Sequence, residues 1–266
     1  MKVFKNIVDI LRIFLSLAIA YLTIWTVATK WFDIYSMLRV LIVYLPALFF
    51  LVFKTKYLAG HPKLLLTYKI ARVLFIIWLI VLTGATVWRM NYLNSTKAAL
   101  DKINNAKITM DDVMGINLPP EPNKDLNDST VAGFDVNNNG IRDDVELAIF
   151  KKYPDSAKIR AGMLQYAQAL QLELTGVDSE ETLKAIMQKR SNAQTCIDNA
   201  SVATDLTNEK DVIWENSDKK IKEVENYILN TDLRIQEQST ILNKYMTTYK
   251  ITSDIDCDID LSTLSN

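Results

Sequence analysis

The chain has very few of the residues from which most enzyme sites are built. Among 266 residues it contains one histidine, His61, and two cysteines. His61 stands beside Pro62 with no second metal ligand or nucleophile near it in the sequence, which is typical of a surface histidine. The glycine-rich loops that hold phosphates, the Walker loop and GxGxxG, are absent. The sequence therefore predicts a protein that is not an enzyme, and it identifies no small-molecule substrate.

An excess of charge of one sign is also missing, because the formal net charge is −1. This balance gives no indication of nucleic-acid binding. The average conceals two unlike parts, however. Up to about Trp88 the chain is strongly apolar, and beyond it the chain is rich in Asn, Asp, Lys and Gln.

Long apolar runs are concentrated in the first part of the chain. They cover about residues 7–28, 34–53 and 70–88. Each is close to the roughly 20 residues that a helix needs to cross a bilayer, so we expect a transmembrane domain over residues 1–90. Cleavage of the first run as a signal peptide is the alternative, with Ala18-Ile19-Ala20 as the cleavage triplet. The run continues past that triplet to Val27, which favours a retained span.

Basic residues predict the orientation of this domain. Lysines occur at the N-terminus and in the second loop: Lys2, Lys5, Lys54, Lys56, Lys63 and Lys69. The positive-inside rule places both segments in the cytoplasm, so the chain after Arg89 would lie outside. The expected location is a bacterial inner membrane, with the N-terminus cytoplasmic and the C-terminal domain periplasmic.

Both cysteines, Cys196 and Cys257, fall in the predicted external part. In an oxidising compartment two cysteines most simply form one disulfide. The alternative is a pair of unpaired buried thiols.

The external part divides at the start of a motif near residue 135. Residues 91–134 are predicted to form a helical extension and a Pro-rich loop, marked by Leu118-Pro-Pro-Glu-Pro122. Residues 135–266 show helical periodicity, with Asp155 or Ser156 as the candidate cap of one helix. The segment Asn230-Thr231-Asp232 is either the cap of a further helix or a kink. The expected fold class is a membrane α-helical protein with three transmembrane helices plus an all-α periplasmic helical bundle.

A stripe at heptad spacing runs through the last long segment, from Ile221 to Tyr249. The core face of an antiparallel bundle is favoured over a coiled-coil partner site. The tail from Asp254 to Asp260 alternates Asp with apolar residues, which indicates an extended segment. Its row of Asp side chains is either a solvated edge or a cation-binding site, and the solvated edge is favoured.

The most specific motif lies between Asp135 and Glu146. Oxygen donors occur at the spacing of a twelve-residue calcium loop: Asp135, Asn137, Asn139, the Ile141 carbonyl, Asp143 and Glu146. Gly140 supplies the turn at the sixth position. The sequence therefore predicts a structural calcium ion of modest affinity. The alternative is an Asn-rich turn whose side chains cap the helix that begins near Asp143.

This motif resembles the solitary calcium loops of dockerin-like and thrombospondin-type-3-like modules. It departs from a paired EF-hand because no helix precedes it, no twin loop exists and Arg142 occupies its eighth position. A wider stretch, about residues 118–172, resembles a family of exported envelope proteins of Gram-negative bacteria. That resemblance implies an envelope location and no activity.

The function predicted from these features is binding or scaffolding. We expect an inner-membrane-anchored protein that is an accessory subunit of an envelope complex, with the membrane and a protein as partners. The alternative is a periplasmic sensor or regulator that signals through its transmembrane helices, with Lys54, Lys56 and Lys63 on the output surface.

Overall fold

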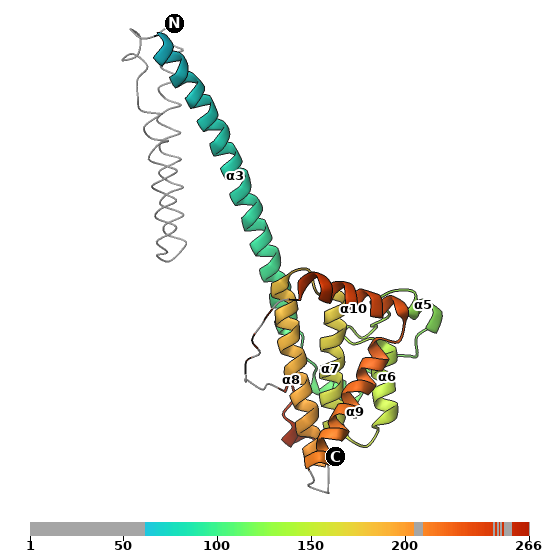
Figure 1. Ribbon diagram of the computed structural model, residues 1–266. Coiled ribbons are helices and arrows are strands. Elements are labelled where there is room, and N and C mark those ends of the chain that lie inside the picture. The colour runs from blue at the N-terminus through green and yellow to red at the C-terminus, as the bar shows by residue number, and fades with distance from the viewer. Residues whose placement is uncertain are drawn as a thin grey trace. The chain divides into compact units, whose positions relative to one another are not determined.

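The computed structural model describes residues 62–204, 210–246, 248, 250, 252 and 257–265. The chain divides into two units, Met1–Arg89 and Met90–Asn266. Helix α3 (Pro62–Asn105) begins in the first unit and ends in the second. The other described helices belong to the second unit (Figure 1).

The membrane part of the sequence prediction is contradicted. Predicted spans 7–28 and 34–53 lie outside the described residues, and the span at 70–88 falls within α3. Among the residues that the structure describes, no helix has the length and apolar character needed to cross a bilayer. A span requires about 20 predominantly apolar residues in succession. The fold class with three transmembrane helices is therefore corrected, together with the inner-membrane and periplasmic location that depended on it.

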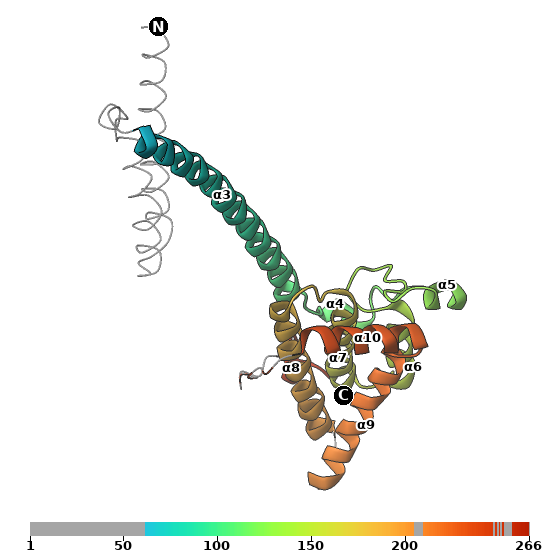
Figure 2. The same ribbon diagram turned by 45° about the horizontal axis from the view of Figure 1, so that its top comes forward.

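An all-α bundle fits the second unit. Its described helices after α3 are α4 (Met110–Met114), α5 (Lys124–Asp128), α6 (Asp143–Lys152), α7 (Ala157–Thr175), α8 (Glu180–Thr204), α9 (Lys210–Ile228), α10 (Asp232–Tyr245) and the 3₁₀ helix η2 (Leu261–Thr263). In both views α7 stands between α8 and α6 (Figures 1 and 2).

Side-chain caps fix where these helices begin. The Thr109 side chain accepts a hydrogen bond from the Asp112 backbone, and the Asp112 side chain accepts one from the Thr109 backbone, so α4 opens with a capping box. Ser156 caps α7 and Thr231 caps α10 in the same way. Of the alternatives that the sequence left open, Asp155 or Ser156 and a cap or a kink at Asn230–Asp232, the structure has Ser156 and Thr231 as caps.

Helix α7 forms the centre of the core. Nearly all its residues are buried, because α4, α6, α8, α9 and α10 all pack against it. Gly162 allows α8 to approach closely, since a Cβ atom at this position would lie 3.0 Å from the Ile197 Cα and backbone N. The close approach places the backbones of α7 and α8 in direct contact.

Three glutamines on α7 make this burial possible, because each bonds to a segment that covers the helix. Gln168 Nε2 donates to the Asn139 carbonyl at 2.7 Å, and Gln171 Nε2 donates to the Ala132 carbonyl at 2.8 Å. Gln165 Oε1 accepts from the Asp258 backbone N–H at 3.1 Å. A buried amide is costly without such partners. The glutamines thus fasten the loop before α6 and the C-terminal segment to the core.

The predicted heptad stripe is split between two helices. Ile221, Val224 and Ile228 lie in the main core on α9, which agrees with a core face. Thr231 then caps α10, and Ile235 on that helix is 49% exposed. The capped break changes the helix direction, so one continuous apolar stripe does not form. Within α10, Ile241 packs in a smaller cluster with two residues of α8, Leu183 and Met187.

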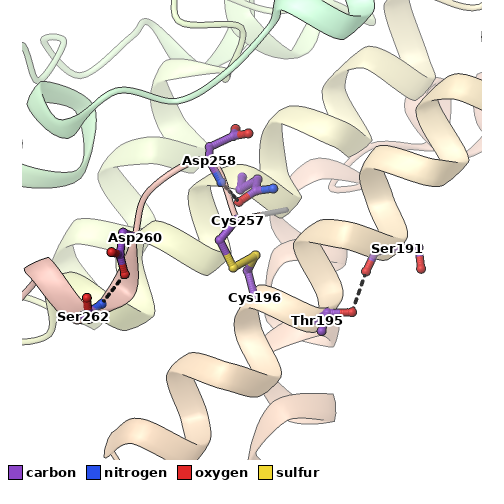
Figure 3. The surroundings of a disulfide bond; sticks show 8 residues. Ser191, Thr195, Cys196, Cys257, Asp258, Asp260 and Ser262 are labelled. Carbon is purple, nitrogen blue, oxygen red and sulfur yellow. Dashed lines mark hydrogen bonds between the residues drawn. A yellow bond between two sulfur atoms is a disulfide. The ribbon is translucent and has the colours of Figure 1, made fainter. Parts of the chain in front are cut away.

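The C-terminal segment is joined to α8 by a disulfide between Cys196 and Cys257 (Figure 3). The sulfurs are 2.05 Å apart and the Cα atoms 5.6 Å apart. Beside it, the Asp258 carboxylate accepts from the Ile108 backbone N–H at 3.1 Å, and Asp260 caps η2 through Ser262. These two members of the predicted Asp row therefore bond to backbone, whereas Asp254 lies outside the described residues.

Candidate functional site

The loop from Asp135 to Glu146 is ordered by its own side chains. Asp135 accepts two backbone hydrogen bonds, from Asn139 N at 3.1 Å to Oδ1 and from Gly140 N at 2.9 Å to Oδ2. Gly140 has φ +82°, a left-handed conformation that glycine adopts at least cost. The carboxylate of Asp135 thus closes the turn around which the rest of the loop is arranged.

The two predicted asparagine ligands form local turns within this loop. Asn137 Oδ1 accepts from Asn139 N at 3.4 Å, and Asn139 Oδ1 accepts from Ile141 N at 2.9 Å. These are Asx-type bonds, in which a side-chain oxygen replaces a backbone acceptor. The Asn137 Nδ2 group donates to Glu146 Oε2 at 3.0 Å, so the two ends of the motif are in contact.

Two acidic residues of α6, Asp143 and Glu146, are buried. Asp143 is 0% exposed and Glu146 is 1% exposed. Asp143 Oδ1 accepts from Val136 N at 3.0 Å, while its Oδ2 atom is buried without a hydrogen-bond partner. Such an atom is unusual, because buried polar atoms nearly always have partners. The unpartnered oxygen therefore marks the inside of the loop as a place that suits a cation or a proton.

Burial also changes the acidity of these two carboxyl groups. Burial raises the pKa of Glu146 to about 7, and the neighbouring negative charges of Asp112 and Asp143 act in the same direction. The pKa of Asp143 is raised as well, first by burial and then by Asp135 and Asp144. Burial disfavours the charged form of an acid, and nearby like charges add to this effect.

The capping alternative for this motif does not describe the loop. The N-cap position of α6 is Arg142, and no side-chain hydrogen bond caps the helix there. The loop oxygens instead accept from backbone groups inside the loop. The side chains of Asp135, Asn137 and Asn139 therefore bond to backbone N–H groups of the turn and do not cap α6.

The description of the loop as an EF-hand-like motif is corrected. Among the described residues, no group of three or more His, Cys, Asp or Glu side chains is assembled so that it could hold a metal ion. The physical reason lies in the loop's own bonding, because Asp135 and Asp143 turn oxygens to backbone N–H groups. Glu146 is bonded to Asn137 in addition.

Two residues outside the motif hold the loop in place, and sequence reasoning did not identify them. Asp112 of α4 accepts from Asn139 Nδ2 at 3.4 Å, and Gln168 of α7 donates to the Asn139 carbonyl. Asn137 Nδ2 also donates to the Asn117 carbonyl at 3.1 Å. The loop is therefore in contact with the segment 109–118 on one side and with α7 on the other.

Arg142 fastens the loop to the far end of α9. Its side chain is fully buried, forms an ion pair with Asp144, and donates to the carbonyls of Tyr227 and Ile228. Gly133 is required beside it, because a Cβ atom there would lie 2.2 Å from Arg142 Cδ. Arg142, which departs from the paired EF-hand pattern, is thus a structural link between the loop and the bundle.

Exposed apolar side chains gather on the segments that contact this loop. We name as the α4 surface five residues: Met110, Met114, Ile116, Leu118 and Val136. Their exposed fractions range from 39% for Leu118 to 66% for Ile116. The bonds from Asn137 to Asn117 and from Asn139 to Asp112 bring the segment 110–118 beside Val136. Apolar residues exposed together are more informative than single ones, because they mark interaction surfaces.

Comparisons of the chain with protein-family models, curated proteins and solved structures give no match. The resemblance to exported envelope proteins of Gram-negative bacteria stays a prediction from short motifs.

Proposed function

We propose that the protein is a non-enzymatic binding or scaffold protein, an accessory subunit of a larger complex, which holds one structural calcium ion in the loop Asp135–Glu146. The observation that carries the proposal is the buried, unpartnered Asp143 Oδ2 atom beside Glu146. The segment 110–118, which contacts this loop, exposes apolar side chains. A cation inside the loop would fix the surface to which a partner binds.

The chemistry of the loop favours calcium over other metal ions. Its predicted ligands are all oxygens: carboxylates of Asp135, Asp143 and Glu146, side-chain oxygens of Asn137 and Asn139, and the Ile141 carbonyl. Calcium accepts six to eight such oxygens in a flexible arrangement, whereas zinc prefers nitrogen and sulfur. Buried carboxylates that are close to each other repel, and a divalent cation would offset that repulsion.

The loop would gather its carboxylates when the ion binds. In the structure these carboxylates accept hydrogen bonds from backbone N–H groups of the loop and from the side-chain amide of Asn137. Each carboxylate has more than one acceptor position, so a bond to an N–H group leaves room for a metal contact. With two asparagines among the ligands the charge is low, and we expect a dissociation constant on the order of 10⁻⁴ to 10⁻³ M.

The α4 surface is the proposed contact for a protein partner. Ile116, at 66% exposure, is its most exposed member, and α4 itself is only five residues long. A helix this short depends on tertiary contacts for its stability. Those contacts include the bond from Asn139 to Asp112, so the cation loop supports the surface.

The experiment is affinity capture of the full chain from cells that express it, with calcium or with chelator present. Ile116→Asp should lose a partner that the unchanged protein retains in calcium, because the new charge lies in the apolar contact. Val202→Asp is the matched control, since Val202 is 55% exposed on α8 and outside the α4 surface. Equal capture by both variants, or repeated recovery of the protein alone, would contradict the proposal.

The alternative function, a sensor or regulator that signals through transmembrane helices, stays a prediction from the sequence.

A further inference from the structure

Asp112 is the acidic residue that connects α4 to the loop. Its Oδ1 atom accepts from Asn139 Nδ2 at 3.4 Å, and its Oδ2 atom accepts from both the backbone N and the Oγ1 of Thr109 at 2.7 Å. The side chain is 8% exposed. Its charge also contributes to raising the pKa of Glu146, which places it near the far end of the motif.

The inside of the loop is marked as a ligand site by an observation separate from Asp112. Asp143 is fully buried, and its Oδ2 atom has no hydrogen-bond partner. Its Oδ1 atom accepts from the Val136 backbone, so the carboxylate lies within the loop.

We infer that Asp112 is a positioning residue for the cation, acting through Asn139, and that it transmits occupancy of the loop to α4. This inference depends on the proposed calcium site. Asp112 holds the amide nitrogen of Asn139, and the Asn139 oxygen stays on the loop side, where it accepts from Ile141 N. Partners that orient ligands in this way affect metal affinity although they do not contact the metal.

The same contact makes α4 sensitive to the ion. Asp112 is both a member of the capping box of α4, whose N-cap is Thr109, and the partner of Asn139. Movement of the Asn139 amide therefore changes the contacts at the start of the helix. A bound ion fixes Asn139, and Asn139 then fixes Asp112. Calcium should therefore protect the α4 backbone, including the N–H groups of Val113, Gly115 and Ile116, which bond to residues 109–112.

The first test is calcium affinity measured by calorimetry on the full chain and three variants. Asp112→Ala removes the contact, and affinity should fall about tenfold, the lower end of the effect for residues that orient metal ligands. Asp112→Asn retains an oxygen acceptor for Asn139 and should recover most of that loss. Thr109→Ala is the matched control, because it also breaks the α4 cap but leaves the bond from Asn139 to Asp112; its affinity should stay within about twofold.

The second readout is hydrogen exchange of the α4 amides with calcium and with chelator. Calcium should slow exchange in the unchanged protein and in Thr109→Ala, and should have no effect in Asp112→Ala. If Asp112→Ala binds calcium as tightly as the unchanged protein, or if Thr109→Ala weakens binding equally, the inference is wrong while the calcium site stands. If the unchanged protein binds no calcium, both the site and the inference are overturned.

Discussion

At the scale of single residues, the most unusual feature is a pair of buried carboxyl groups without a basic partner in contact. Asp143 and Glu146 are fully buried, yet their bonds go to the Val136 backbone and the Asn137 amide. The buried carboxylate of Glu173, by contrast, forms an ion pair with Arg190 at 3.2 Å. A buried carboxylate without a compensating charge is costly. Binding of a cation or a proton should therefore stabilise the folded protein most at these two residues.

The acidity of Glu146 predicts how the metal-free protein responds to pH. Because its pKa in the folded protein is about 7, against an ordinary 4.5, the folded state holds a proton that the unfolded state has lost between these values. Unfolding free energy should therefore fall as pH rises from about 4.5 to about 7. Glu146→Gln should flatten this part of the profile, measured by urea unfolding in chelator.

The control for this prediction is Glu181→Gln, at an exposed carboxylate outside the loop. It should leave the profile unchanged. A Glu146→Gln profile with the same slope as the unchanged protein would show that Glu146 is not the responsible group.

At the scale of helices, the contact between α7 and α8 depends on one missing side chain. Gly162→Ala would place a methyl group 3.0 Å from the Ile197 backbone, which cannot move without shifting α8. We expect a loss of about 1–3 kcal/mol in unfolding free energy, as for other overpacked sites. Urea unfolding of the full chain measures it.

The comparison variant is Gly84→Ala, at a helical glycine where an added Cβ meets nothing within 4 Å. Alanine is the better helix former there, by about 1 kcal/mol, so this variant should be neutral or slightly stabilising. A stabilised Gly162→Ala protein would mean that the two helices are not in close contact.

The helices also show what a sequence can and cannot predict. The Asp135–Glu146 motif and the neighbourhoods of the caps at Ser156 and Thr231 could be found in the sequence, because short-range bonding depends on neighbouring residues. The near-complete burial of α7 could not be predicted, because its glutamines resemble a solvent-facing side. Their partners, such as the Ala132 carbonyl, are brought near by folding.

The same limit applies to the candidate site. Asp112 lies 27 residues from Asn139 in the chain, and nothing in the spacing of the motif refers to it. Asp112 lies in the short helix α4, whose five residues show no apolar periodicity from which a helix could be predicted. Contacts of this range depend on the packing of the whole unit, which a local pattern does not contain.

At the scale of the whole molecule, the disulfide holds the C-terminal segment to the bundle. It joins residues 61 positions apart, and closing a loop of that length restricts the unfolded chain by about 4 kcal/mol in the entropy model. Replacing both cysteines, Cys196→Ala with Cys257→Ala, should lower the unfolding free energy by about that amount. The measurement is urea unfolding of the double variant; an unchanged midpoint would contradict this role.

Three helices of the second unit contact the Asp135–Glu146 loop: α4, α7 and, through Arg142, the end of α9. The central claim is that this loop holds calcium, and a calcium titration of the full chain tests it most directly. Calorimetry should show one saturable site with a dissociation constant on the order of 10⁻⁴ to 10⁻³ M. Asp135→Ala should abolish it, and Asp155→Asn, an exposed change outside the loop, should not. The claim would be contradicted by no binding at calcium concentrations several-fold above this dissociation constant, or by equal binding by Asp135→Ala.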